Sequence, residues 1–369
     1  MINKASLIIY TLAHFAVDFS CFYILMGAFS NRIIDINIIA LGFLLYNVLA
    51  FGSQMFIGYF ADQYKVKPFI LAGLGVLIVF AGVLSAALPW TALVLCAIGN
   101  AFFHIGGGID SLVYAKGRSS RCGIFVSAGA VGVVLGTVAG RSGLTLAVPS
   151  LALVFSAFFI CMVCIRENNE KDKNFRNPKS VSSYIPYHNL DLTTKLIIYL
   201  CLISIVIRSF VGSEIPITWK TNTALFILPG ICAFAGKLTG GFLADRFGAG
   251  NTGVLSLIIS VPLLTLFNNN IIWCSIGLVL FNMTMSITLW GIAAQLPEQP
   301  GFAFGLTTFA LLTGNIPTFF YRFDGKQARL IIPVLIVCSA VCIFFAINNK
   351  RGEKYDDSGD NFVSKRLSV

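Results

Sequence analysis

The chain has 369 residues, of which 57% are hydrophobic and only 11% charged, and its formal net charge is +10. Soluble domains carry about 25% charged residues, so this composition excludes a protein with a fully water-exposed surface. The basic residues are spread over many loops instead of forming one face, which argues against nucleic acid as a partner.

Twelve apolar runs follow one another along the chain, each about 20 residues long and able to cross about 30 Å of hydrocarbon as a helix. The first half of the chain supplies six of them: Ala5–Phe29, Asn37–Ala61, Pro68–Leu88, Thr91–Ala115, Cys122–Gly140 and Gly143–Ile165. The second half supplies the other six: Thr194–Ser213, Lys220–Ala244, Ala249–Phe267, Ile271–Gln295, Gly301–Tyr321 and Gln327–Ile347. We predict an all-α membrane protein with twelve transmembrane helices in two pseudo-symmetric six-helix bundles.

Polar stretches define the expected domains. Residues 1–165 form an N-terminal half, 166–193 a cytoplasmic linker, 194–348 a C-terminal half and 349–369 a disordered cytoplasmic tail. Lys and Arg are roughly three times as frequent in the loops on the side of the termini as in the opposite loops, and the positive-inside rule places such loops in the cytoplasm. We therefore expect a multi-pass monomer in the lipid bilayer of the inner membrane, with both termini cytoplasmic.

Titratable residues interrupt the first and fourth apolar runs. His14 and Asp18 are four positions apart and share one face of a helix near mid-membrane, and His104 lies at a comparable depth. A charged carboxylate at this depth costs about 2.5–3.5 kcal/mol, so Asp18 should face a wet cavity or a partner. Because histidine and a shifted carboxylate exchange protons near neutral pH, we predict that all three couple the protein to protons. For each histidine alone, a structural hydrogen bond to a neighbouring helix is an equal alternative.

A short motif ends the second apolar run and returns at the end of the eighth. Gly58 and Asp62 belong to the first copy, and Gly241, Asp245 and Arg246 to the second, close to half a chain further on. This self-similarity indicates two homologous membrane halves with a substrate site between them. Glycine lets helix ends approach, and an aspartate can accept hydrogen bonds from a neighbouring helix N-terminus or an Arg. We predict a latch that holds one conformation; the alternative is a charged residue that merely ends a helix.

The fifth apolar run carries glycines at regular spacing: Gly123, Gly132, Gly136 and Gly140. Glycines four residues apart lie on one helix face and allow close backbone packing. We predict a helix-packing role for all four.

The second half contributes basic and polar candidates. Arg208 lies deep in the seventh run and should either bind an anionic group of a substrate or pair with Asp18 across the halves. Glu214, near the outer end of that run, and Asn282 and Trp290 of the tenth run are further candidates for substrate binding.

Two other features are expected to be structural. Lys237 lies about two turns from the inner end of the eighth run and should extend its ammonium group to the interface. The ten cysteines lie in or beside apolar runs, without His or carboxylate neighbours at metal-ligand spacing. We expect no metal site, no catalytic residue and no cofactor, with a proton gradient as the driving force.

In these features the chain resembles the major facilitator superfamily, which has two six-helix halves and the motif Gly-x-x-x-Asp-Arg-x-Gly-Arg-Lys after its second helix. The first copy here keeps Gly58 and Asp62 but has Gln63 in place of the arginine; the second copy keeps more of the motif, namely Gly241, Asp245, Arg246 and Gly248. The resemblance implies a transporter whose first, fourth, seventh and tenth helices line the cavity. That implication is what makes Asn282 and Trp290 candidate contacts.

A narrower resemblance concerns proton-coupled exporters within that superfamily. The glycine pattern of the fifth run resembles the signature of drug exporters, although Thr137 replaces its proline. His14-Phe15 with Asp18, and Phe103-His104, resemble segments of the fosmidomycin-resistance group, with Ile105 in place of a proline. This resemblance implies proton-coupled export.

We therefore predict a secondary active transporter, not an enzyme, that exports a small organic molecule or drug in exchange for protons by alternating access. One alternative is a proton-coupled uptake symporter of the same fold. Another, from a different class, is a non-transporting membrane receptor or assembly factor. Titratable groups at mid-membrane argue against the latter, because a scaffold has no need to bear their cost.

Overall fold

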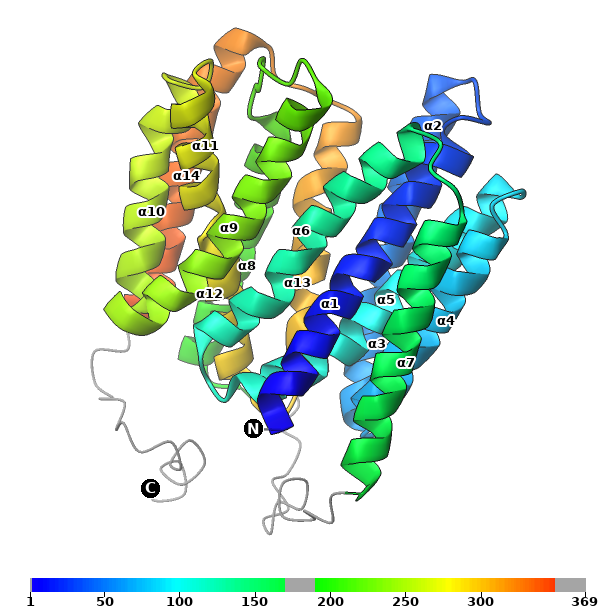
Figure 1. The fold of residues 1–369 in the computed structure, drawn as a ribbon. Helices are drawn as coiled ribbons and strands as arrows, with labels where there is room; N and C mark the ends of the chain where they lie inside the picture. The colour runs from blue at the N-terminus through cyan, green and yellow to red at the C-terminus, as the bar shows by residue number, and fades with distance from the viewer. Residues whose placement is uncertain (1, 170–189, 349–369) are drawn as a thin grey trace, which may run out of the picture.

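The computed structural model describes residues 2–169 and 190–348, and within these ranges helices are joined by short connections (Figure 1). The first range contains α1 (Ile2–Tyr23), η1 (Ile24–Phe29), α2 (Ile36–Asn47), η2 (Val48–Gly52), α3 (Ser53–Gln63), α4 (Pro68–Leu84), α5 (Pro89–Ala115), α6 (Ser119–Arg141) and α7 (Ala147–Asn169). The second contains α8 (Leu192–Glu214), α9 (Thr223–Phe247), α10 (Ala249–Thr265), α11 (Ile271–Asn282), α12 (Thr284–Gln295), α13 (Pro300–Asn315), η4 (Ile316–Phe319) and α14 (Gly325–Asn348). The predicted tail and most of the predicted linker lie outside the described residues.

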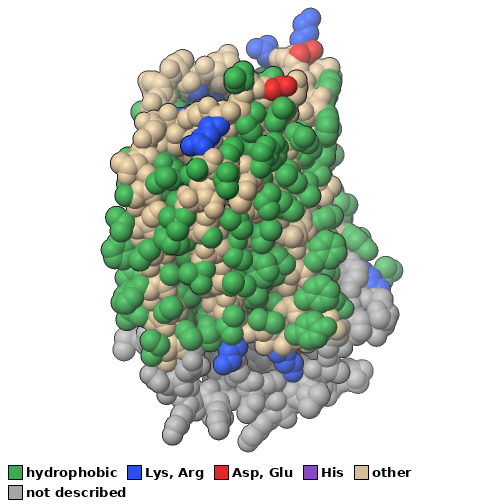
Figure 2. All heavy atoms as spheres, turned by 90° about the vertical axis from the view of Figure 1, so that its right-hand side faces the viewer, with side chains coloured by type: hydrophobic (Ala, Val, Ile, Leu, Met, Phe, Trp, Pro, Cys, Tyr) green, Lys and Arg blue, Asp and Glu red, His purple; other side chains and the backbone are tan. Residues whose placement is uncertain are grey.

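The predicted set of transmembrane helices is confirmed. Ten helical stretches of the described chain are long and apolar enough to span a membrane, and two shorter apolar helices, α4 and α10, complete the twelve. At 17 residues each, these two extend about 25 Å, close to the thickness of the hydrocarbon. On the face shown in Figure 2, hydrophobic side chains cover most of the height, and charged side chains lie toward the two ends.

Local sequence signals set the helix ends. α9 begins at Thr223, three residues after the predicted start, because the side chain of Asn222 accepts a hydrogen bond from the N–H of Leu225. α5 ends where Lys116 and Gly117 adopt positive φ angles of 47° and 75°, which a helix cannot continue. Proline occupies the first position of three helices, where its missing N–H costs nothing: α4, α5 and α13.

Three spans contain interruptions that the hydropathy pattern does not predict. Wide turns of π-helix, η1 and η2, lie within the first and second spans. The tenth span is interrupted at Met283, between α11 and α12, where the N–H of Met283 bonds to Leu280 three residues back instead of four. Such interruptions often occur at functional sites in membrane helices.

The helices pack as two groups, the first bundle (α1–α7) and the second bundle (α8–α14), each with its own buried apolar cluster. The largest cluster draws on residues 7–163 and includes Leu289 and Phe304 of the second bundle. Two smaller clusters draw on residues 197–346. We call the end where α1 begins and α14 ends the base, at the bottom of Figure 1; α3 and α9 end there, and α6 and α13 begin there.

Candidate functional site

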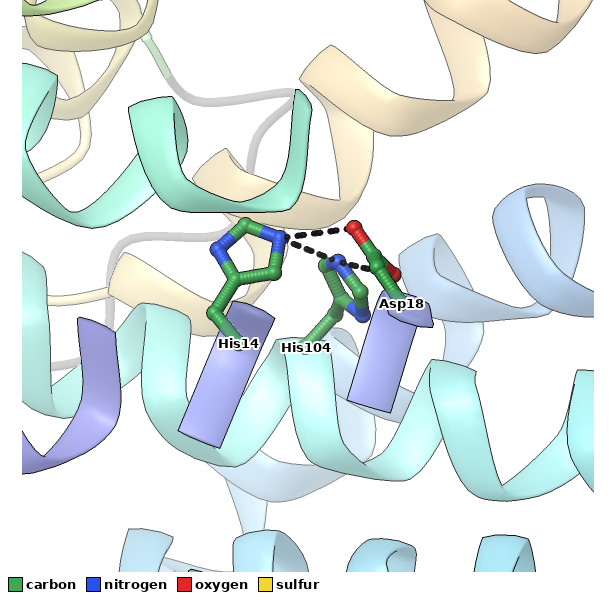
Figure 3. Close-up of side chains that lie close together, drawn as sticks. All are labelled: His14, Asp18 and His104. Atoms are coloured by element: carbon green, nitrogen blue, oxygen red, sulfur yellow. Dashed lines mark hydrogen bonds and ion pairs between the residues drawn. The ribbon is translucent and has the colours of Figure 1, made fainter. Parts of the chain in front are cut away.

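Three buried titratable side chains of the first bundle meet between α1 and α5 (Figure 3). His14 and Asp18 lie on successive turns of α1 and are 5% and 8% exposed; His104 of α5 is 5% exposed. His14 Nε2 lies 3.2 Å from one carboxylate oxygen of Asp18, and His104 Nε2 lies 3.7 Å from the other. The two Nε2 atoms are 2.9 Å apart. We call these residues the His–Asp cluster.

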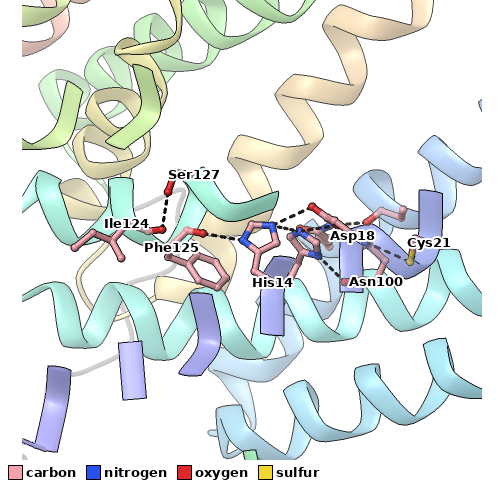
Figure 4. Close-up of polar contacts among 10 residues, drawn as sticks. His14, Asp18, Cys21, Asn100, Ile124, Phe125 and Ser127 are labelled. Atoms are coloured by element: carbon pink, nitrogen blue, oxygen red, sulfur yellow. Dashed lines mark hydrogen bonds and ion pairs between the residues drawn. The ribbon is translucent and has the colours of Figure 1, made fainter. Parts of the chain in front are cut away.

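Backbone carbonyls fix the hydrogen positions on both imidazole rings (Figure 4). His14 Nδ1 lies 2.8 Å from the carbonyl oxygen of Phe125, and His104 Nδ1 lies 2.9 Å from that of Asn100. A carbonyl oxygen only accepts hydrogen bonds, so both Nδ1 atoms carry a hydrogen. A neutral imidazole has a single N–H, which each ring has thus already used.

The contact between the rings therefore requires one further proton. Two nitrogens 2.9 Å apart form a hydrogen bond only if a hydrogen lies between them, and a pair bonded in this way would hold three N–H protons and a charge of +1. The Asp18 carboxylate balances that charge, and Asn100 donates a hydrogen bond of 2.8 Å to it. With that proton, the three side chains together are electrically neutral.

The same three side chains are also the described group best placed to ligate a metal, since their donor atoms all lie within 4.8 Å of one another. Histidines that bind metals also donate their second N–H to carbonyls. However, an ion about 2.0–2.1 Å from both Nε2 atoms would subtend an angle of only about 90° across 2.9 Å, tighter than tetrahedral coordination. A shared proton fits this contact better than a metal ion does.

Sequence reasoning missed two residues that shape the cluster. Asn100, which supports Asp18, lies four residues before His104 and so on the same face of α5; this spacing is a signal that could have identified it. Gly129 of α6 provides space, because a Cβ there would overlap Asp18 Oδ2 and His14 Nε2. No sequence spacing linked Gly129 to α1.

Gly129→Ala should strongly reduce transport with little loss of stability. The added methyl would push apart Asp18 and His14, whose side-chain ends can move while the backbone stays in place. Because only these side-chain ends move, we expect an almost unchanged melting temperature, whereas transport should fall by about tenfold or more. Gly73→Ala is the matched control, since its Cβ would meet only Ile160 at 3.8 Å. Parental transport by Gly129→Ala would show that the cluster geometry is dispensable.

The second bundle places two cations within its membrane-spanning helices. Arg208 of α8 is 5% exposed and forms no ion pair with Asp18, so the pairing that the sequence left open is not formed. Lys237 of α9 is half-buried and interacts electrostatically with Arg208 and Asp18. The backbone carbonyl of Lys237 faces Gly123 of α6 in the first bundle. The expectation that its ammonium group extends to the membrane surface stays a prediction.

The structure does not bring the other predicted substrate contacts into the His–Asp cluster. Glu214, at the end of α8, accepts hydrogen bonds from Arg322 at 3.1 Å and from the N–H of Phe323 at 2.7 Å. Trp290 of α12 donates to the carbonyl of Gly117 at 2.6 Å, which joins the bundles near the base. Asn282 of α11 donates to Leu278 of its own helix at 2.8 Å. Their role in substrate binding stays a prediction.

The two motif aspartates join the bundles at the base. Asp62 accepts hydrogen bonds from the N–H groups of Gly301 (3.0 Å) and Phe302 (2.7 Å), at the start of α13. Asp245 accepts them from Ser119 (2.8 Å) and Ser120 (3.2 Å), at the start of α6. Each carboxylate thus meets the positive end of a helix in the other bundle. We call these two contacts the latches.

The motif glycines make the latches possible by close approach. A Cβ at Gly58 would overlap the carbonyl of Gly301, and one at Gly241 would lie 2.6 Å from the carbonyl of Ser119. Arg246 lies beside the ring of Phe247, with 5.3 Å from its Cζ to the ring centre. Arg246 thus has a described contact outside the latches, whereas the sequence grouped it with them.

The glycines of α6 lie against backbone, as a packing face would. Gly132, Gly136 and Gly140 face carbonyls of the first span: those of Phe15, Phe19 and Tyr23. Gly123 instead faces the carbonyl of Lys237 on α9. One glycine series thus packs α6 within its own bundle and, at its basal end, against the other bundle.

Twelve apolar helices in two bundles, with buried titratable groups among them, define a multi-pass membrane protein. The sequence model of the Major Facilitator Superfamily matches residues 5–318, so the chain belongs to this superfamily of transporters. Its members carry small molecules across membranes and are not enzymes. The resemblance to the superfamily is therefore confirmed, whereas the narrower one to the fosmidomycin-resistance group stays a prediction.

Solved structures give the same fold. The crystal structure of the E. coli fucose:proton symporter FucP is similar with a TM-score of 0.62 and 14% identity, over 95% of this chain and 99% of that one. A second structure of FucP, in the outward conformation, has a TM-score of 0.58 and 12% identity over the same shares. Comparison with curated protein sequences gives no match. At these identities the similarity shows the fold alone.

Proposed function

We propose that this transporter couples the movement of a small organic molecule to protons, and that the His–Asp cluster carries the proton. The observation that best supports this proposal is the 2.9 Å contact between His14 Nε2 and His104 Nε2. Both Nδ1 atoms already form hydrogen bonds to backbone carbonyls. Loss of the shared proton leaves two lone pairs facing each other beside a carboxylate. Repulsion then opens the contact, so protonation and local geometry change together.

The cluster can communicate with the second bundle. Lys237 interacts electrostatically with both Asp18 and His104 across the interface between the bundles. A change of charge in the cluster therefore alters an interaction between the first and second bundles, which move relative to each other during transport. One proton moving down 100 mV supplies about 2.3 kcal/mol, enough for a gradient of roughly fiftyfold.

We propose export by exchange as the principal mode, on the basis of the exporter-like glycine pattern that α6 packs against α1. Uptake together with protons is the second candidate, supported by the fold shared with FucP, whose structure is described as that of a fucose:proton symporter.

Purified protein in liposomes, with a pH gradient imposed in either direction and a panel of compounds, tests coupling and mode together. In exchange, a transported compound accumulates on the acidic side; in co-transport, it accumulates on the neutral side. One proton per molecule supports about a tenfold ratio per pH unit. Protein-free liposomes control for weak bases that enter acidic compartments unaided. Accumulation that ignores the direction of the gradient would reject proton coupling.

We further propose that the base faces the cytoplasm of the inner membrane, on the grounds of the basic residues that the loops on that side carry. The closed latches then make this a state closed to the cytoplasm. In a variant without native cysteines, Ser182→Cys should react only with reagents that reach the cytoplasm. Ser142→Cys, in the exposed connection between α6 and α7, should react from outside. The reverse pattern would invert the orientation.

A further inference from the structure

Two cations within the membrane-spanning helices of the second bundle lack an anionic partner. Arg208 is 5% exposed, and its Nε is buried without a hydrogen-bond partner. Among the described residues, neither Arg208 nor Lys237 forms a hydrogen bond or an ion pair. A buried, unpaired charge is strongly unfavourable, so a fold that retains one at Arg208, with the half-buried Lys237 also unpaired, needs a partner from elsewhere.

Lys237 belongs to the part of α9 that borders the first bundle, where its backbone carbonyl faces Gly123 of α6. Its charge is close enough to those of Arg208 and of the His–Asp cluster to interact with them. An anion bound between the bundles at this level would meet both cations.

The described carboxylates in the interior are already engaged. Asp18 is bound to two histidines and Asn100, and Asp110 accepts a hydrogen bond from Tyr10. Three further acids lie at the ends of the helices: half-buried Asp62 and exposed Asp245 form the latches, and buried Glu214 pairs with Arg322. Compensation for Arg208 and Lys237 therefore does not come from these residues.

The helix interruption lies against the same part of α9. Gly236, next to Lys237, packs on the carbonyl of Val279 and on Asn282 Cβ, and Gly240 packs on Met283, where the tenth span is interrupted. Interrupted helices in transporters border substrate sites, because their end groups remain available to a ligand. This observation is independent of the charges and places a ligand region beside Lys237.

We propose that Arg208 and Lys237 bind the oxyanion group of the transported molecule, so that the substrate is a small organic acid. The planar guanidinium can donate two parallel hydrogen bonds to a carboxylate or phosphate, and the ammonium group adds a point charge. The inference rests on the proposed function only in taking the ligand to be the cargo. The proposal specifies that the substrate carries an anionic group; it does not specify the rest of the substrate's structure.

Equilibrium binding to the purified protein in detergent, without any pH gradient, tests the site. Thermal unfolding is measured with matched probes at millimolar concentration: succinate against succinamide, and glycerol 3-phosphate against glycerol. At least one anion should raise the melting temperature by several degrees, while its uncharged partner has no effect. The pair that responds distinguishes a carboxylate from a phosphate substrate.

Variants assign the effect to the two cations. Arg208→Gln should abolish the shift, Lys237→Gln should weaken binding by about tenfold or more, and Lys326→Gln, at an exposed surface cation, should change nothing. Equal stabilisation by an uncharged partner, no stabilisation by either anion, or an unchanged shift in Arg208→Gln would each overturn the proposal. Failure of proton coupling in liposomes would leave these binding results untouched.

The ligand-free protein provides a second, independent measurement. Arg208→Met keeps the apolar length of the side chain and removes its charge. If Arg208 serves a ligand, the empty variant should melt at the parental temperature or above it, because an uncompensated charge has been removed. A melting temperature several degrees below the parent would assign Arg208 a structural role and overturn the proposal.

Discussion

Asp18→Asn should abolish proton-driven accumulation while the protein still exchanges substrate between compartments. Asn keeps the size of the side chain and approximates the neutral acid, but it removes the charge that balances the shared proton of His14 and His104. Breaking a buried ion pair at one partner costs about 3–5 kcal/mol, a change of a hundredfold or more in the occupancy of the proton site. Uptake in liposomes with and without a pH gradient measures both quantities.

Asp110→Asn is the matched control, because Asp110 is another buried acid of the first bundle and is bonded to Tyr10 outside the cluster. It should retain the response to the gradient. If Asp18→Asn accumulates substrate as fast as the parent, the proton is carried elsewhere. His104 would then be the first residue to test; Glu214 would follow, although its carboxylate is engaged by Arg322 and Phe323.

Removing both latches should slow transport far more than it weakens binding. Asp62→Asn and Asp245→Asn each take a negative charge from a helix N-terminus where the carboxylate accepts two hydrogen bonds. Losses at such positions cost about 0.5–2 kcal/mol each, so the double variant shifts the open-to-closed ratio of the base by roughly fivefold to a thousandfold. The substrate exchange rate in liposomes and the equilibrium affinity in detergent separate the two effects.

The reactivity of the Cys122 thiol measures directly whether the base is open or closed. It lies on the first turn of α6, is 2% exposed, and should become reactive in the latch variants when it is the single remaining cysteine. Asp35→Asn serves as control, because Asp35 caps its own helix α2 and does not bridge the bundles. Loss of affinity with a parental exchange rate in either latch variant would refute the assignment.

Hydropathy predicted the spans because it depends on side chains one at a time. It could not predict which helices meet, since contacts such as Asp62 with the start of α13 join residues more than half a chain apart. The His–Asp cluster was partly predictable, because His14 and Asp18 share a helix face. The orientation of the two imidazole rings depends on the backbone carbonyls of Phe125 and Asn100. Every residue has a backbone carbonyl, so the sequence does not indicate which ones accept these hydrogen bonds.

The partner of Arg208 could not be predicted from the sequence either. Its depth marked it as unusual, and the sequence allowed either a substrate or Asp18 as its partner. Only the packing of α1 against α5 decides that Asp18 is satisfied within its own bundle.

The two latches also bear on the ancestry of the molecule. Each bundle offers an aspartate at the end of its second span and receives one at the start of its fifth, so the contact is made once in each direction. Reciprocal contacts of this kind are the signature of a twofold dimer, in which one surface patch is its own complement. A pair of identical half-length proteins, facing each other in the membrane, would have formed the same two contacts before gene duplication and fusion joined them into one chain.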